Sequence, residues 1–216
     1  MPYILYVYCS FSIAIAAIIG GLRFSRIDPA YYPFIFFLWL ATTNEIVTYS
    51  LSTLNITTNI SNNVYVLLEA WLLIWQARKW NAISSRTWYW VLQFAITICW
   101  LVDVISSQGF YNLHSVFRII AGALFLVLFI GHSNRLIFQF DKPVIKDAGF
   151  LISIGLVFFY SFKILVEVYW WQGVNASDKY LYGLYNVIVF INVFVNLIYI
   201  IAVLWIPTKA KFTTFS

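Results

Sequence analysis

Seven long apolar runs, separated by short polar connections, constrain this chain more than any other feature of its sequence. An α-helix needs about 20 mostly apolar residues to cross the hydrocarbon core of a membrane. The runs that reach or approach this length are 2–22, 31–54, 63–78, 88–107, 110–132, 149–170 and 183–206. We therefore predict an all-α protein whose single domain, residues 1–216, is a bundle of seven transmembrane helices. The third run is the weakest, because it is the shortest and has polar residues at both ends.

The composition excludes the soluble classes of protein. Of the 216 residues, 62% are apolar and only 10% are charged, whereas soluble domains carry about 25% charged residues. Seven spans use about 140 residues, which leaves no room for an appended catalytic or nucleic-acid-binding domain. The basic residues are spread over several short segments, so we expect membrane lipids and a small molecule as partners, and no nucleic acid. The oligomeric state is left open.

Basic residues are concentrated in alternate connections. The connections after the first, third and fifth runs, together with the C-terminal tail, contain Arg23, Arg26, Arg78, Lys79, Arg86, Arg135, Lys142, Lys146, Lys209 and Lys211. Lys179 alone is expected on the opposite side. Because Lys and Arg near the ends of spans are retained in the cytoplasm, we predict that the N-terminus is outside and the C-terminus is cytoplasmic.

Three Asn-x-Ser/Thr sequences, which begin at Asn55, Asn59 and Asn175, lie in connections that this orientation places outside. Such sequences are glycan acceptors in secreted proteins. Loops rich in Asn, Ser and Thr also produce them by chance, and these loops are too short to hold an acceptor far from the bilayer. We therefore predict a bacterial inner (cytoplasmic) membrane.

The five prolines all lie outside the predicted spans. Many transporters place discontinuous helices around their substrate, and proline is a frequent cause of a sharp kink in a helix. The sequence therefore gives no indication of a broken helix.

Ionisable residues inside the spans are the strongest indication of function. A charged side chain at the bilayer centre costs a few kcal/mol on insertion scales, so such residues are rare and often functional. They are Glu45, Glu69, Asp103, His114, Arg118, Lys163 and Glu167, and the helical rise places all of them in the outer half of the bundle. The polar residues recur at helical spacing, so they form stripes that must face protein or water. We therefore predict one polar pocket that opens toward the outside.

The residues predicted to bind a ligand combine charged, aromatic and amide side chains. Arg118 and Lys163 would contact an anionic group, whereas Glu45 and Glu69 would contact a cation or exchange protons. Aromatic residues would pack against the body of the ligand. The complete predicted set is Glu45, Glu69, Trp100, Asp103, His114, Arg118, Tyr160, Lys163, Glu167 and Asn192.

The alternative is that these charges only hold the helices together, as polar contacts between membrane helices commonly do. The pairs considered are Lys163 with Glu167 or Glu69, and Arg118 with Asp103. Four carboxylates against two cations leave an acidic excess, so at least one carboxyl should be protonated, hydrated or bound to a ligand. Glu45 and Glu69 are the candidates because they lie deepest. Glu69 is the stronger of the two, since its sequence neighbours offer no hydrogen-bond donor.

No metal site and no catalytic residue is predicted, and the cofactor is left unknown. His114 and His132 are eighteen residues apart on one helix, a separation of about 27 Å, so they cannot share an ion. Cys9 and Cys99 lie inside predicted spans, where we expect them to be small core residues.

The favoured hypothesis is a non-enzymatic membrane protein, sensor-like or carrier-like, that binds a small polar or amphiphilic ligand in the outer pocket. The chain shares its span count with retinal proteins and receptors, but its last span has no lysine before Lys209 to bind retinal. One alternative is a membrane-embedded enzyme that acts on a lipid or isoprenoid and uses Arg118 to hold a phosphate. Another is a structural subunit of a membrane complex, indicated only by the small residues Gly122, Gly131 and Ala121–Ala123.

Overall fold

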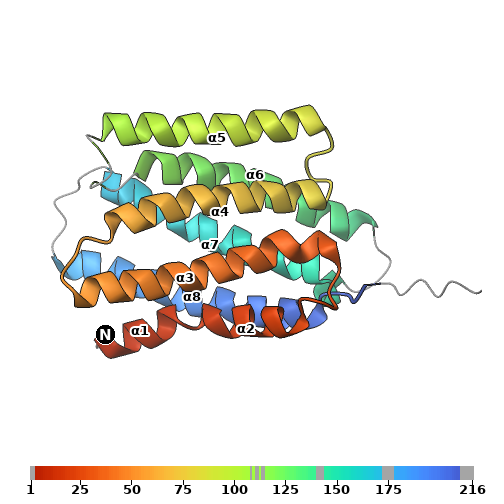
Figure 1. The fold of residues 1–216 in the computed structure, drawn as a ribbon, viewed down its shortest axis with the longest axis horizontal. Coiled ribbons are helices and arrows are strands. Elements are labelled where there is room, and N and C mark those ends of the chain that lie inside the picture. Colours follow the sequence, from red (N-terminus) through yellow and green to blue (C-terminus); the bar gives the residue numbers. More distant parts are fainter. Residues whose placement is uncertain are drawn as a thin grey trace, which may run out of the picture.

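The computed structural model describes residues 3–107, 109, 112, 115–139, 144–171 and 178–209, and this part of the chain is all-helical (Figure 1). Its α-helices are α1 (Tyr3–Ser10), α2 (Ile13–Arg23), α3 (Tyr32–Thr53), α4 (Asn59–Lys79), α5 (Arg86–Ser106), α6 (Ser115–Gln139), α7 (Ala148–Trp171) and α8 (Asp178–Trp205). Two 3-10 turns, η1 (Pro29–Tyr31) and η2 (Val144–Lys146), precede α3 and α7. Because α1 and α2 together form the first passage, the helices make seven passages. The predicted all-α, seven-helix fold is confirmed.

Among the described residues, five helical segments are long and apolar enough to cross a membrane, namely η1 with α3, α5, α6, α7 and the greater part of α8. This apolar bundle is consistent with an integral membrane protein.

The helix α4 is the third passage, the one predicted to be weakest, and it is not among these five segments. Its first turns contain Asn59, Asn62 and Asn63, which lower its mean hydropathy. It begins at Asn59 rather than at residue 63, the predicted start of this span. Glu69 therefore lies at the midpoint of α4 and not in its outer half.

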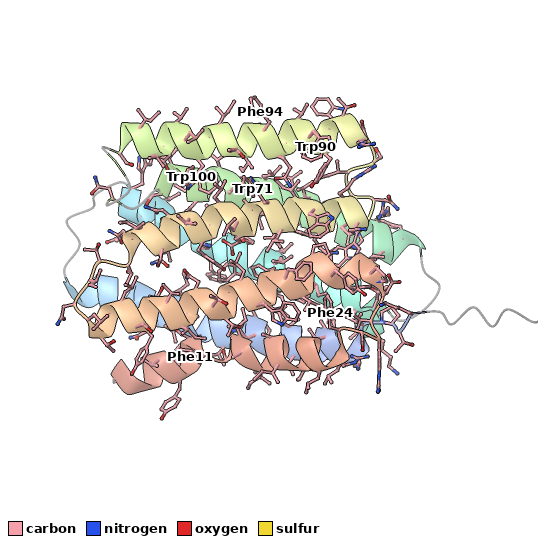
Figure 2. All side chains as sticks on the ribbon, in the orientation of Figure 1. Phe11, Phe24, Trp71, Trp90, Phe94 and Trp100 are labelled. Carbon is pink, nitrogen blue, oxygen red and sulfur yellow. The ribbon has the colours of Figure 1, made fainter. Side chains whose placement is uncertain are left out.

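Six passages form a ring, and α5 packs outside it. The helices α2, α3, α4, α6, α7 and α8 each contact the next, and α8 returns to α2. The helix α5 contacts α4 and α6 at the edge of the bundle (Figure 1). Its outer face is apolar, and Phe94, which is 69% exposed, points away from the other helices (Figure 2). A soluble protein rarely exposes such a face, so we expect this side of α5 to contact lipid.

The first passage is broken between α1 and α2, although no proline indicated it. The amides of Ser12 and Ala14 donate to carbonyls three residues back, at 3.2 and 3.0 Å, rather than four residues back as in an α-helix. The Ser12 hydroxyl donates to the Cys9 carbonyl at 2.6 Å and accepts from the Asn196 amide of α8 at 2.8 Å. Serines that bond their own backbone often bend helices, and Ser12, which also accepts a bond from α8, lies at this break.

Polar side chains form hydrogen bonds between helix ends on one side of the bundle. Gln76, buried in α4, accepts from the Phe34 amide and donates to the Ala30 carbonyl, both at 2.8 Å. It thereby satisfies groups at the start of α3 that lack helical partners.

Arginines fasten the same side through backbone carbonyls. Arg23 donates to carbonyls at the end of α8, and Arg78 and Arg135 donate to carbonyls that follow α4. The helices α2, α4, α6 and α8 all end on this side (Figure 1), where cations are favoured by the helix dipole. The uneven distribution of basic residues thus has a structural role, and the orientation in the membrane stays a prediction.

Candidate functional site

A cavity of about 120 Å³, here called the central cavity, lies among the first passage, α3, α4, α7 and α8. Its polar lining consists of Ser10, Glu45, Tyr65, Glu69, Lys163, Asn192, Asn196 and Tyr199. Phe37, Ala41 and Phe159 belong to the apolar part of its wall. Charged side chains from α3, α4 and α7 therefore meet at one place.

Glu69 has two partners in the central cavity. It is 2% exposed, and its Oε2 atom lies 3.2 Å from Lys163 Nζ. The Tyr65 hydroxyl, one turn earlier on α4, donates to its Oε1 atom at 3.1 Å. Lys163 Nζ also lies 5.0 and 5.3 Å from the ring centroids of Phe159 and Tyr160, which adds cation–π attraction. The sequence neighbours Leu68 and Ala70 offer Glu69 no donor, as expected, but Tyr65 of the preceding turn and Lys163 of α7 supply its partners.

Glu45 is the carboxylate of the cavity that lacks such partners. It lies half-buried on α3 and lines the cavity. Within the described ranges the salt bridges are Arg118–Glu167 and Lys163–Glu69, and Glu45 forms neither a salt bridge nor a hydrogen bond there. Since the charges of Lys163 and Glu69 cancel, ionised Glu45 leaves the cavity with one uncompensated negative charge.

Two buried tyrosine hydroxyls lie near Glu69. Tyr160 and Tyr199 are each 2% exposed, and both lie within electrostatic range of Glu69. Tyr160 packs against Phe125 with ring centroids 4.8 Å apart, whereas Tyr199 lines the cavity. The Tyr199 hydroxyl has no hydrogen-bond partner in the described part of the chain. Because buried hydroxyls normally have a partner, this group fits a cavity that holds water or a ligand.

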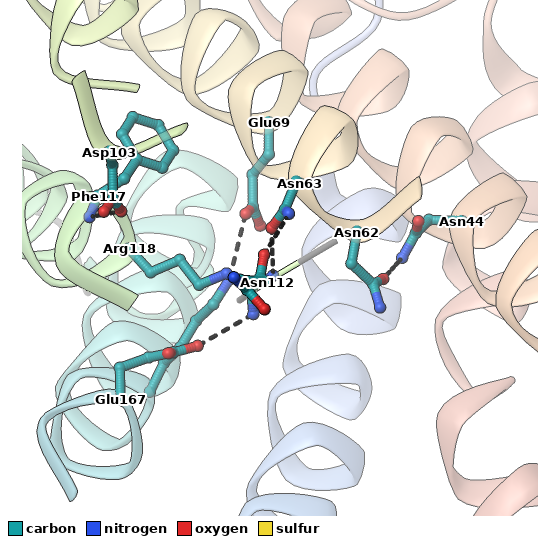
Figure 3. Close-up of polar contacts among 10 residues, drawn as sticks. Asn44, Asn62, Asn63, Glu69, Asp103, Asn112, Phe117, Arg118 and Glu167 are labelled. Carbon is teal, nitrogen blue, oxygen red and sulfur yellow. Dashed lines mark hydrogen bonds and ion pairs between the residues drawn. The ribbon is translucent and has the colours of Figure 1, made fainter. Parts of the chain in front are cut away.

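A second group of polar residues, here called the closed cluster, consists of Asn63, Trp100, Asp103, Arg118 and Glu167. Arg118 Nη1 lies 3.1 Å from Glu167 Oε1, and the two side chains are 11% and 10% exposed (Figure 3). Arg118 Nη2 lies 3.5 Å from Asn63 Oδ1, and Trp100 donates to the Asn63 carbonyl at 2.9 Å. None of these five residues lines the central cavity.

Asp103 belongs to the closed cluster through the backbone of α6. Its Oδ2 atom accepts from the Phe117 amide at 2.7 Å (Figure 3). The helix α6 begins at Ser115, and the first amides of a helix have no helical partner. The helix dipole also favours a carboxylate at this position. Asp103 of α5 therefore caps α6 and does not pair with Arg118, one of the pairs that we considered.

Eight of the ten residues predicted to bind a ligand fall into two groups, and these groups do not share one pocket. Glu45, Glu69, Lys163 and Asn192 line the central cavity. Trp100, Asp103, Arg118 and Glu167 lie in the closed cluster, and Tyr160 is buried beside the cavity. His114 lies outside the described residues. The Lys163–Glu69 pair forms as the structural alternative expected, whereas Glu167 pairs with Arg118 and not with Lys163.

Four polar residues of the cavity wall were not in the predicted set. Tyr65 precedes Glu69 by one turn, and Asn196 follows Asn192 by one turn, so helical spacing connects both to predicted residues. Tyr199 lies on the same stripe of α8, but an aromatic residue at such a position is usually an ordinary core residue. No sequence pattern indicated Ser10 as a site residue, because it lies in a run that is otherwise apolar.

No protein-family model, characterised protein or solved structure matches this chain. Within the described residues no group of three or more His, Cys, Asp or Glu side chains is arranged to hold a metal ion. The site must therefore be interpreted from its own chemistry.

Proposed function

We propose that this chain is a membrane protein that binds a small polar ligand in the central cavity, in a sensor-like or carrier-like role. The observation that carries the proposal is a polar cavity in which a buried salt bridge and a further carboxylate, Glu45, lie together. Removing a charge from water is unfavourable unless the charge is paired. In the closed cluster Arg118 pairs with Glu167 and Asp103 caps α6, although Arg118 Nε has no partner in the described part of the chain. Glu45 has no salt bridge or hydrogen bond of any kind among the described residues.

The size of the cavity favours a polar ligand over an amphiphilic one. Its volume of about 120 Å³ is well below the roughly 300–1,000 Å³ of sites for drug-sized ligands. A water molecule occupies about 30 Å³ in the liquid, so the cavity has room for roughly four waters or a ligand of that size.

The broken first passage supports a moving part. Ser10 lies at the end of α1 and lines the cavity, and Asn196 joins the cavity wall to Ser12 at the break. Many carriers form their binding sites at discontinuous helices. A hinge at Ser12 would couple ligand entry to a movement of α1.

The enzyme alternative gains no such support, and of the small residues behind the structural-subunit alternative only Ala123 and Gly131 are exposed. In the enzyme hypothesis Arg118 holds a phosphate, but its guanidinium is paired with Glu167 outside the cavity. In the structural-subunit hypothesis Gly122 lies on a lipid-facing seam. A Cβ atom added there would lie 2.8 Å from Ile164 Cγ1, so Gly122 allows close packing of α6 on α7 within the bundle.

The membrane context is part of the same proposal. We expect the N-terminus outside, the C-terminus in the cytoplasm and a bacterial inner membrane, because the basic residues are concentrated on the side where α2, α4, α6 and α8 end.

A thermal-unfolding screen of the detergent-purified protein tests the proposed function. Unfolding is followed by the fluorescence of the ten tryptophans, in the presence of salts, small amines, amino acids or small organic acids. A ligand that binds the folded state raises its stability by mass action. We expect at least one compound to raise the Tm of the wild-type protein and not that of Ala41→Leu, in which the larger side chain fills the cavity.

The matched control is Ala123→Leu, the same substitution at an exposed position of α6. It should keep the response to the compound. If no compound acts, or if Ala41→Leu responds as the wild type does, the central cavity is not a binding site.

A further inference from the structure

We propose that the occupant of the central cavity is a small monovalent cation, held by the Glu45 carboxylate and by the backbone oxygen of Ser10 at the break of the first passage. This inference rests on the proposed function and names its ligand. It is carried by the charge balance of the cavity, by the oxygen atoms around it and by a buried hydroxyl in its wall.

The charge balance admits one positive charge. Lys163 Nζ and Glu69 Oε2, 3.2 Å apart, neutralise each other, and Glu45 adds one negative charge at the same cavity. A monovalent cation makes the sum zero. A divalent cation would leave one positive charge in a buried site, which is as unfavourable as the negative charge that it replaces.

The break of the first passage leaves a backbone oxygen free at the cavity. The Ala14 amide donates to the Phe11 carbonyl, so the Ser10 carbonyl does not receive its usual helical bond. Ser10 itself lines the cavity. In carriers, carbonyls of unwound helical segments coordinate alkali cations, because these carbonyls are no longer occupied by amides.

A buried hydroxyl in the cavity wall points independently to an occupant. Tyr199 is 2% exposed, and its hydroxyl has no hydrogen-bond partner within the described ranges. It lies in the wall, within electrostatic range of Glu69. A hydroxyl oxygen binds a cation through its lone pairs, directly or through a water that shares the cavity.

The ligand atoms select the chemical class of the cation. The polar wall offers carboxylate, hydroxyl, amide and carbonyl oxygens, together with the ammonium group of Lys163. Oxygen ligands suit hard cations, whereas Zn²⁺ and copper prefer imidazole and thiolate. The volume of about 120 Å³ fits Na⁺ or K⁺ with a few waters and is too small for a bulky organic cation.

The experiment measures the Tm of the full-length purified protein in NaCl or KCl against N-methyl-D-glucamine chloride, at constant pH, ionic strength and detergent. We expect Na⁺ or K⁺ to raise the Tm in a saturable manner by about 2–4 °C. N-methyl-D-glucamine serves as the reference because it cannot enter the cavity. Glu45→Gln, which keeps the size of the side chain and removes its charge, should abolish the rise.

Two further variants keep the test valid if Glu45→Gln folds poorly. Ala41→Leu fills the cavity but retains Glu45, and it should also abolish the rise. Asp28→Asn removes a carboxylate far from the cavity and can still accept the hydrogen bond that Asp28 forms with the Ala30 amide. It should respond to the cations as the wild type does.

Three outcomes would overturn the inference. They are an equal Tm in all salts, a rise that persists in Glu45→Gln, and, in a second series in N-methyl-D-glucamine chloride at lower pH, an equal rise produced by acid alone, which would make the occupant a proton. If the cations fail but a small organic compound stabilises the wild type and not Ala41→Leu, the inference fails and the proposed function stands.

Discussion

The central cavity and the closed cluster contain the same types of residue but use them differently. In the closed cluster, Arg118 pairs with Glu167, and Asp103 accepts a backbone amide of α6. In the central cavity, Lys163 pairs with Glu69, and Glu45 is left over beside open space. The number of partners available to each carboxylate, and not the residue type, separates the two regions.

The comparison shows how an intramembrane charge can be assigned to a role. An ion pair whose side chains form further hydrogen bonds within the protein can be interpreted as a structural contact. A carboxylate that faces a cavity without a partner needs water, a proton or a ligand. Mutations in the closed cluster should therefore mainly lower the free energy of unfolding. Mutations in the central cavity should mainly weaken ligand binding.

The largest effect is expected from Arg118→Met. The substitution removes the cation and leaves Glu167 buried and unpaired, which should lower the free energy of unfolding by about 3–5 kcal/mol. Chemical unfolding in detergent, followed by tryptophan fluorescence, measures this loss. Most of it should return in Arg118→Met/Glu167→Gln, because the double variant leaves no buried charge. A loss below about 1 kcal/mol in the single variant would mean that the pair is solvated and that the cluster is not closed.

A smaller effect is expected from Lys163→Met. Glu69 loses its salt bridge but keeps the hydrogen bond from Tyr65, and water in the cavity can solvate its charge. We expect a loss of about 1–3 kcal/mol, the usual cost of leaving a buried polar group partly unsatisfied. The same unfolding assay compares it with Arg118→Met, and Lys163→Met/Glu69→Gln should recover the loss. Equal losses of unfolding free energy in Lys163→Met and Arg118→Met would mean that the central cavity and the closed cluster do not differ in this respect.

The smallest effect on stability is expected from Glu45→Gln. Glu45 has no partner to lose among the described residues, so Glu45→Gln should not lower the free energy of unfolding when only N-methyl-D-glucamine is present. Removing the uncompensated charge should raise it slightly or leave it unchanged, so the unfolding curve of the variant should coincide with that of the wild type or lie slightly above it. If the variant is destabilised as strongly as Arg118→Met, Glu45 is a structural residue.

The sequence was sufficient for the fold because hydropathy and helical spacing are local properties. Each of the seven passages overlaps an apolar run, although α6 begins at Ser115 and ends at Gln139 rather than spanning residues 110–132. The helix α4, with its three early asparagines, is weak by composition, as expected. The break at Ser12 was missed. A serine inside an apolar run bends a helix only when its partners allow it, and one partner, Asn196, lies on a helix at the other end of the chain.

The candidate site could be predicted only in part, for the same reason. Spacing placed Lys163 and Glu167 on one face of α7, but it could not show that they pair with residues of different helices. Lys163 pairs with Glu69 of α4, and Glu167 pairs with Arg118 of α6. The rotation of each helix against its neighbours decides these partners, and that rotation depends on the packing of the whole bundle.

The most direct test of the account compares two buried alanines, Ala41 in the cavity wall and Ala121 one turn after Arg118 on α6. They are 6% and 4% exposed, so they differ mainly in access to the cavity. Each is replaced by cysteine in a background in which Cys9 and Cys99 are changed to alanine. The rate of labelling by a small water-soluble thiol reagent is then measured in the folded protein, with denatured protein as the reference. Because a buried thiol in apolar surroundings is inert, the account predicts that Ala41→Cys reacts at least about tenfold faster than Ala121→Cys. Equal rates at the two positions would contradict the account, because the central cavity would then be no more open than the closed cluster.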